Sequence, residues 1–223
     1  MENCTFESPY GPTDLTDLGA STLNSLLPNT QMYFNGGAYD ALNVPLGTNG
    51  VTLQASQSIS SRTADYNQPA TDAGRSTFNG AFILYGNNAL NDIILLSTPA
   101  TIGGNGVRIT GGTNNVVTGS QICSTGDRYT IGLILNASQL NVTNNSIFGN
   151  SIGLSAQNQS RVSVKNSQFD TLDTTGVAIS GIRLSVSNLL LDNSQITVSG
   201  TTSSVVGIRS IRDLLSRLLM IVL

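Results

Sequence analysis

The chain has 223 residues, a net charge of −3, no His and no Trp, and about a third of its residues are Asn, Ser or Thr. Hydrophobic residues make up 39% of the chain and charged residues only 10%, which excludes an intrinsically disordered chain. The absence of His excludes a Ser-His-Asp triad, a Cys-His dyad and a His-ligated metal site.

The charge pattern also limits the partners. Lys165 is the single lysine and the net charge is negative, which argues against binding to nucleic acid or to an anionic membrane surface. No apolar run approaches the ~18 residues that a transmembrane helix needs. We therefore expect no nucleic-acid partner and no membrane insertion by this segment.

Residues 1–29 are predicted to form an N-terminal cap. Thr13 or Asp14 can N-cap a short helix that runs to Leu27 and is stopped by Pro28. The first 27 residues contain no basic region followed by a continuous apolar stretch, so they are not a secretory signal peptide, and the export signals of an exported protein would lie outside this chain. Cys4 and Cys123 can form a bridge or remain two thiols.

Residues 30–77 are predicted to form the irregular first coils of a repeat structure. Extended segments are expected at 31–34 and 50–59, separated by glycines and turn residues. The polar, turn-rich stretch 60–75 is expected to be a loop that projects from the body of the protein.

Two patterns recur between residues 78 and 210. The first has an apolar residue, then Asn two positions later and a second apolar residue five positions later, as in 142–147, 164–169 and 191–196, with weaker copies at 90–95 and 117–122. The second is Gly followed by apolar-x-apolar, beginning at Gly80, Gly106, Gly132, Gly153, Gly181 and Gly207. Both patterns share a period of 21–28 residues, which is typical of a solenoid.

A single unit cannot bury its apolar face, so the units are expected to stack. Stacking places Val142, Val164 and Leu191 in one inward column and Ile147, Phe169 and Ile196 in a second. Stacking also forms a structural ladder at a sharp corner, from residues that tolerate the left-handed backbone conformation, and stacked amides can form hydrogen bonds along it. The ladder positions are Asp92, Gly119, Asn144, Asn166 and Asn193. The alternative is that these residues only mark surface turns.

The segment 211–223 departs from the Asn/Ser/Thr-rich composition. Ile211, Leu214, Leu215, Leu218, Leu219 and Val222 follow the spacing of one helix face. This pattern predicts either a C-terminal amphipathic helix that caps the last coil, or a truncation tail that happens to be apolar.

The stacked Gly-apolar and Val-x-Asn-x-x-Ile coils resemble right-handed parallel β-helix proteins of the pectate-lyase-like architecture over roughly residues 30–210. The segments 57–59, 62–66 and 87–93 resemble, more narrowly, the β-helical passenger region of bacterial autotransporter-type surface proteins. The resemblance implies an all-β solenoid: a right-handed parallel β-helix with irregular coils at 30–77 and regular coils at 78–210. It also implies that the protein lies on the cell surface or is secreted.

The function predicted on this basis is a non-catalytic, adhesive module from a longer autotransporter-like chain, with a host-surface or carbohydrate ligand and no cofactor. The alternative is a lyase or hydrolase acting on uronan-type carbohydrate. Relatives that cleave pectate use clustered Asp for calcium and an Arg as base. Asp170 and Asp173 are the close acidic pair in the regular coils, and they are predicted either to hold calcium or to lie in a solvated turn. Most Phe positions have the phase of core residues, so no aromatic platform for sugar stacking is expected.

Three arginines form a candidate ligand-binding stripe. Arg108, Arg183 and Arg209 share the outward phase of the Gly-apolar-x-apolar strands, and the last two fall on consecutive coils. Neighbouring like charges repel each other unless an anion binds between them. The stripe is therefore predicted to be either a small anion-binding surface or an ordinary solvated face.

Overall fold

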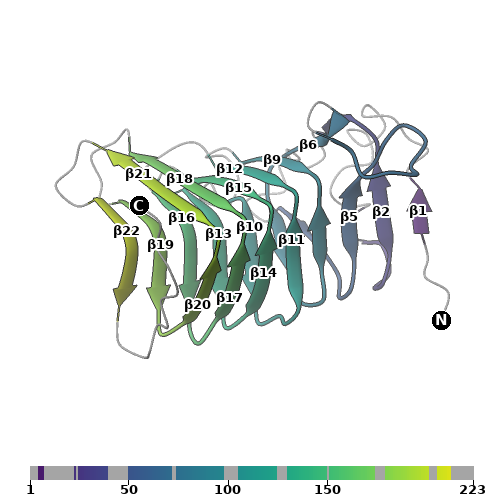
Figure 1. Cartoon of the computed structure of the whole chain (residues 1–223). Helices are drawn as coiled ribbons and strands as arrows, with labels where there is room; N and C mark the ends of the chain where they lie inside the picture. Colours follow the sequence, from purple (N-terminus) through teal and green to yellow (C-terminus); the bar gives the residue numbers. More distant parts are fainter. Residues whose placement is uncertain are drawn as a thin grey trace.

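The protein is a rod of stacked parallel strands, seen side-on in Figure 1. The computed structural model describes residues 5–7, 23, 25–39, 50–71, 74–97, 105–124, 130–149, 151–173, 179–200 and 205–211. All paired strands within this part run parallel and belong to three sheets that wrap around one core.

The strands of each sheet follow one another along the rod. Sheet A contains, in spatial order, β1 (Thr5–Glu7), β2 (Gln31–Phe34), β5 (Ser58–Ser61), β8 (Ala89–Asn91), β11 (Asn115–Thr118), β14 (Gln139–Thr143), β17 (Arg161–Lys165) and β20 (Asn188–Asp192). Sheet B contains β3 (Gly37–Tyr39), β6 (Ser76–Asn79), β9 (Ile94–Ser97), β12 (Gln121–Ser124), β15 (Ser146–Gly149), β18 (Gln168–Asp173) and β21 (Gln195–Gly200). Sheet C contains β4 (Val51–Thr52), β7 (Phe82–Leu84), β10 (Val107–Thr110), β13 (Ile131–Asn136), β16 (Ile152–Gln157), β19 (Ile179–Ser185) and β22 (Val205–Ile211).

Each coil takes one strand from sheet C, then one from sheet A, then one from sheet B. Five regular coils follow this order, from β7–β8–β9 to β19–β20–β21. The predicted columns are confirmed: Val164 pairs with Val142 on one side and with Leu191 on the other, and all three side chains are buried. The architecture is therefore the predicted parallel β-helix.

The recurring glycine at or near the start of the central sheet C strands is required by close packing. A Cβ on Gly132 would lie 2.7 Å from the Ile147 side chain and 2.7 Å from the carbonyl oxygen of Gly153 in the next coil. Gly106 meets Ile122 at the same distance. The inward column of sheet B thus packs directly onto the glycine column of sheet C, which explains why the two sequence patterns keep the same phase.

The core changes character along the rod. The first coils are filled by the aromatic cluster Phe34, Tyr39, Phe78 and Phe82, whose neighbouring rings lie 5.0–5.6 Å apart. The middle coils are filled mainly by Val, Ile and Leu, with Phe169 on β18 as the exception among the aromatic residues. Toward the C-terminal end of the rod some inward side chains are only partly covered, and Leu189, Ile196 and Ile208 are half-buried at the edge of the core.

The structure differs from the sequence-based expectation in two local segments. The stretch 169–173, interpreted as a turn, belongs to the strand β18, because its backbone pairs with β21 over six residues. The polar stretch expected at 60–75 begins at Arg62, since β5 extends through Ser61. The hydroxyls of Ser61 and Ser76, 3.0 Å apart and buried, tie the two ends of this loop together.

Most of both predicted end segments lies outside the described residues. Of the helix expected between Thr13 and Leu27, the first part falls on residues that are not described, whereas Leu23 is buried in the core. Residues 212–223 also lie outside the described part. Within the described part of the chain, no helix is long and apolar enough to span a membrane.

The column assignment predicts a sharp contrast between adjacent residues. Val164→Asp places a carboxylate at a fully buried position between two apolar neighbours, so we expect a loss of roughly 3–5 kcal/mol in the free energy of unfolding. Ser163→Asp, one residue earlier on the outward face, should cost about 0.5 kcal/mol or less. Urea unfolding followed by far-ultraviolet circular dichroism measures both, and equal effects at 163 and 164 would contradict the register.

Candidate functional site

The corner between sheets A and B is the most regular surface feature of the rod. In each of the five regular coils one residue at the turn from A to B has positive φ: Asp92 (55°), Gly119 (61°), Asn144 (56°), Asn166 (48°) and Asn193 (43°). Asn, Asp and Gly adopt this left-handed conformation at little cost, which allows the chain to turn sharply in a single residue. These five are the positions of the predicted structural ladder.

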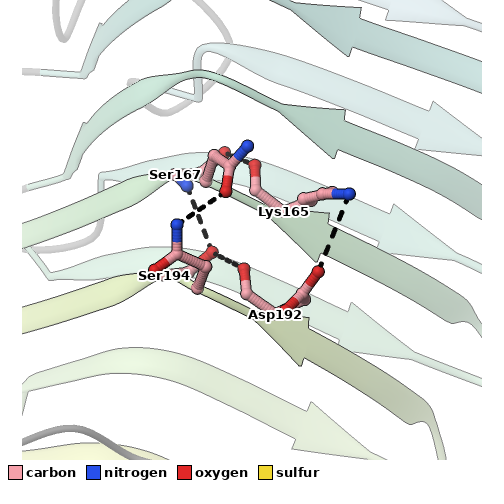
Figure 2. Close-up of polar contacts among 6 residues, drawn as sticks. Lys165, Ser167, Asp192 and Ser194 are labelled. Atoms are coloured by element: carbon pink, nitrogen blue, oxygen red, sulfur yellow. Dashed lines mark hydrogen bonds and ion pairs between the residues drawn. The ribbon is translucent and has the colours of Figure 1, made fainter.

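A second, buried ladder lies one residue further on, and it joins the coils. The backbone N–H of Ser120 donates to Oδ1 of Asn145 at 2.8 Å, that of Asn145 to Oγ of Ser167 at 3.2 Å, and that of Ser167 to Oγ of Ser194 at 3.1 Å. Figure 2 shows the Ser167–Ser194 rung. Each hydroxyl of this last pair also donates to the backbone carbonyl two residues earlier, at 2.8 Å. Every coil is thus tied to the next inside the corner.

The outer ladder makes fewer contacts. Nδ2 of Asn193 donates to Oδ1 of Asn166 at 2.8 Å. Beside this rung, Nζ of Lys165 lies 3.9 Å from a carboxylate oxygen of Asp192, and both side chains are about 60% exposed (Figure 2). A surface ion pair of this kind stabilises the fold by less than about 1 kcal/mol. The side-chain contacts at the outer ladder therefore add little to the stability of the fold, and the ladder side chains mainly shape the surface of the corner.

A shallow groove of about 490 Å³ follows this corner. We call it the corner groove. One wall is formed by the outer ladder and the other by the first residues of successive sheet B strands, which pair in register. The residues that line it are Arg75, Ser120, Gln121, Asn144, Asn145, Ser146, Asn166, Ser167, Gln168, Asn193 and Gln195. Arg75 is the one charged residue among them.

Asp92 and Arg75 interact electrostatically near the groove. Burial raises the pKa of the Asp92 carboxyl, and the positive charges of Arg75 and Arg62 oppose this rise only in part. Asp92 also explains why the outer ladder has a glycine, without a side chain, at position 119: a side chain there would collide with the Asp92 carboxylate. The single positive charge at the groove is therefore close to a negative one.

The structure separates the predicted arginine stripe. Arg183 and Arg209 are paired neighbours on β19 and β22, and both are exposed. Arg108 lies three strands away on β10, because Ile134 and Ser155 occupy the positions between it and Arg183. The structure therefore brings together two of the three arginines.

The predicted acidic pair lies on β18. Oδ2 of Asp170 accepts a hydrogen bond from Nε2 of Gln168 at 2.7 Å, and the side chain of Asp173 is outside the described part. Among the described residues no three Asp, Glu, Cys or His side chains come together. Cys123 carries a half-buried thiol whose pKa is raised by burial, and the other cysteine, Cys4, is not among the described residues, so the choice between a bridge and two thiols stays open.

Two surface features were not predicted. Phe148 lies on the outward face of sheet B, paired with Cys123 and Asp170, although the phenylalanines are expected mostly in the core. The corner between sheets C and A also turns through residues of positive φ, among them Ala137 and Val186, which are poor turn formers and give no sequence signal. The two-residue period of a strand, counted from the predicted inward Ile147, is the signal that could have placed Phe148 outward.

Comparison with known proteins agrees with this architecture. A family model described as a right handed beta helix region matches residues 47–210. The chain belongs to the right-handed β-helix family. This match confirms the predicted handedness and fold class, and it covers all five regular coils.

The similarity to individual proteins is low. The chain is similar to a solved structure titled "Crystal structure of pectate lyase Pel9A", with 10% sequence identity and a TM-score of 0.25. The alignment covers 76% of this chain and 56% of the pectate lyase chain, so this chain spans little more than half the length of that protein. No curated protein matches the sequence.

The buried ladder predicts a specific stability effect. Ser167→Ala removes the acceptor of the buried Asn145 N–H, and an unsatisfied buried donor costs about 1–3 kcal/mol. Ser163→Ala, on the outward face of the same strand, should change the free energy of unfolding by about 0.5 kcal/mol or less. Urea unfolding compares the two, and equally small losses would show that the ladder is not needed.

The electrostatics of Asp92 predict a dependence on pH. Because its pKa is raised in the folded state, the carboxyl stabilises the fold relative to the unfolded chain at low pH, and this contribution is lost as pH rises through the folded pKa. Asp92→Asn, at a φ that suits Asn, should raise the melting temperature at pH 7 and leave it nearly unchanged near pH 3. A parent protein that melts higher than the variant at pH 7 would contradict this assignment.

Proposed function

We propose that this chain is a non-catalytic module of a bacterial surface or secreted protein, and that it acts by adhesion. The observation that carries the proposal is the corner groove. Its side chains repeat in register over four coils, on a frame held by backbone pairing and by the buried ladder. Such a surface presents one chemistry repeatedly along a rigid rod, which suits the binding of an extended ligand.

The distribution of carboxylates supports binding over turnover. Cleavage of a glycosidic bond by two carboxylates requires both to converge on one sugar linkage. Among the described side chains, Asp65 lies in the loop after β5, Asp92 at a corner, Asp170 on sheet B and Asp192 at the end of β20. Each of these four belongs to a different element of the fold.

The external location is part of the same proposal. The chain is rich in Asn, Ser and Thr and contains a single Lys, a composition that is commoner in extracellular bacterial proteins. The resemblance of the coils to autotransporter passenger regions points the same way. Fractionation of the source cells, with detection of the chain by antibody, should find it on the cell surface or in the medium.

The proposal makes a direct prediction about activity. Incubated with calcium and either pectate or alginate, the protein should produce no unsaturated product and no new reducing ends. Absorbance of unsaturated uronides and a reducing-sugar assay are the measurements, with an active pectate lyase as the positive control. Turnover that is lost in Asp170→Ala would overturn the non-catalytic function and establish a uronan lyase or hydrolase instead.

A further inference from the structure

We propose that the corner groove binds a linear, uncharged polysaccharide that lies along the axis of the β-helix. This inference rests on the proposed function and names the ligand class of the same surface. It depends on three properties of the groove: its repeat, its hydrogen-bonding chemistry and its charge.

The repeat of the groove matches a polymer. Three successive coils contribute one corner Asn and one residue at the start of the sheet B strand, as in Asn144 with Ser146 and Asn166 with Gln168, and the coil before them contributes Gln121. Parallel pairing places equivalent positions of neighbouring coils about 4.8 Å apart. A polymer that presents the same groups at every monomer can contact all the coils that line the groove in one orientation, whereas a compact ligand would contact only one or two coils.

The hydrogen-bonding chemistry matches hydroxyl groups. A side-chain amide both donates and accepts, as a sugar hydroxyl does. The side-chain amides of Gln121, Asn144 and Gln195 make no hydrogen bond with any residue of the described part, so they are open to a ligand. Nε2 of Gln168 uses one of its donors on Asp170, which leaves its oxygen free to accept.

The charge and polarity of the groove argue against other polymers. Nucleic acid binding depends on several cations along the phosphate backbone, and Arg75 is the one cation in the lining, with Asp92 within electrostatic range. A protein interface usually has an apolar and aromatic centre, and no apolar side chain lines the groove. Phe148 instead flanks it, two residues beyond Ser146 on the outward face of β15, where a sugar ring can pack.

Affinity electrophoresis tests the inference with defined probes. Native gels contain mixed-linkage β-glucan, xyloglucan or galactomannan, and a parallel gel contains polygalacturonate. We expect retardation of the parent protein by at least one uncharged polymer. The double variant Gln121→Ala/Asn144→Gly should bind about tenfold more weakly, because two hydrogen bonds are lost. Glycine accepts the φ of 56° at position 144, so the corner should keep its fold.

A matched control lies at the corner between sheets C and A. Gln157→Ala/Asn158→Gly changes the same residue types, also with a positive φ at the Asn, and should bind as the parent does. Absence of retardation by all three uncharged polymers, retardation by polygalacturonate alone, or equal weakening in the control would overturn the inference. These outcomes leave the proposed function standing, since uronan turnover tests that function separately.

Discussion

The hydrogen bonds from one coil to the next inside the corner between sheets A and B determine the position of every other residue. A strand slip of one residue would turn each inward side chain outward, so the register of a β-helix must be fixed in every coil. The buried ladder does this, because the backbone N–H at Ser120, Asn145 and Ser167 finds its acceptor only in the correct residue of the next coil. With this register set, Val142, Val164 and Leu191 stack in the core and the glycine column of sheet C accepts the side chains of sheet B.

The same register explains why the chain carries so little charge. Equivalent positions of neighbouring coils face each other at close range, so a charge repeated at one position would repel its neighbours along the rod. An uncharged amide can be repeated without this penalty, and the corner groove repeats it. Where charges do fall in register, Lys165 meets Asp192 and the two compensate each other. Arg183 and Arg209 are the uncompensated case among the described pairs, which makes sheet C a less favourable place for a long ligand.

The sequence is informative wherever one residue type is required by geometry. Glycine under a packed Ile and Asn at a left-handed corner recur for physical reasons, and both recurrences reveal the period and the columns. The buried ladder escapes sequence reasoning because Ser and Asn both supply an acceptor, so Asn145 interrupts the serines at 120, 167 and 194, and serine is common throughout this chain. Residues 169–173 resemble a turn because Asp and Thr favour turns in isolation, whereas here pairing with β21 overrides that preference. Phe148 escapes prediction for a different reason: a large aromatic residue suggests a core position, although the inward Ile147 before it already places Phe148 on the outward face.

Burial along the rod also determines which residues of the corner groove can be substituted without disturbing the fold. The strands β20, β21 and β22 stand last in their sheets, and their inward side chains Leu189, Ile196 and Ile208 are less covered than those of the central coils. A repeat protein can lose its least stable coil while the others stay folded, since each coil contacts mainly its neighbours. Changes at Asn193 or Gln195 could therefore weaken binding by loosening the last coil. Gln121 and Asn144 lie between coils that are covered on both sides, so a change in binding there reports on the lost amide itself.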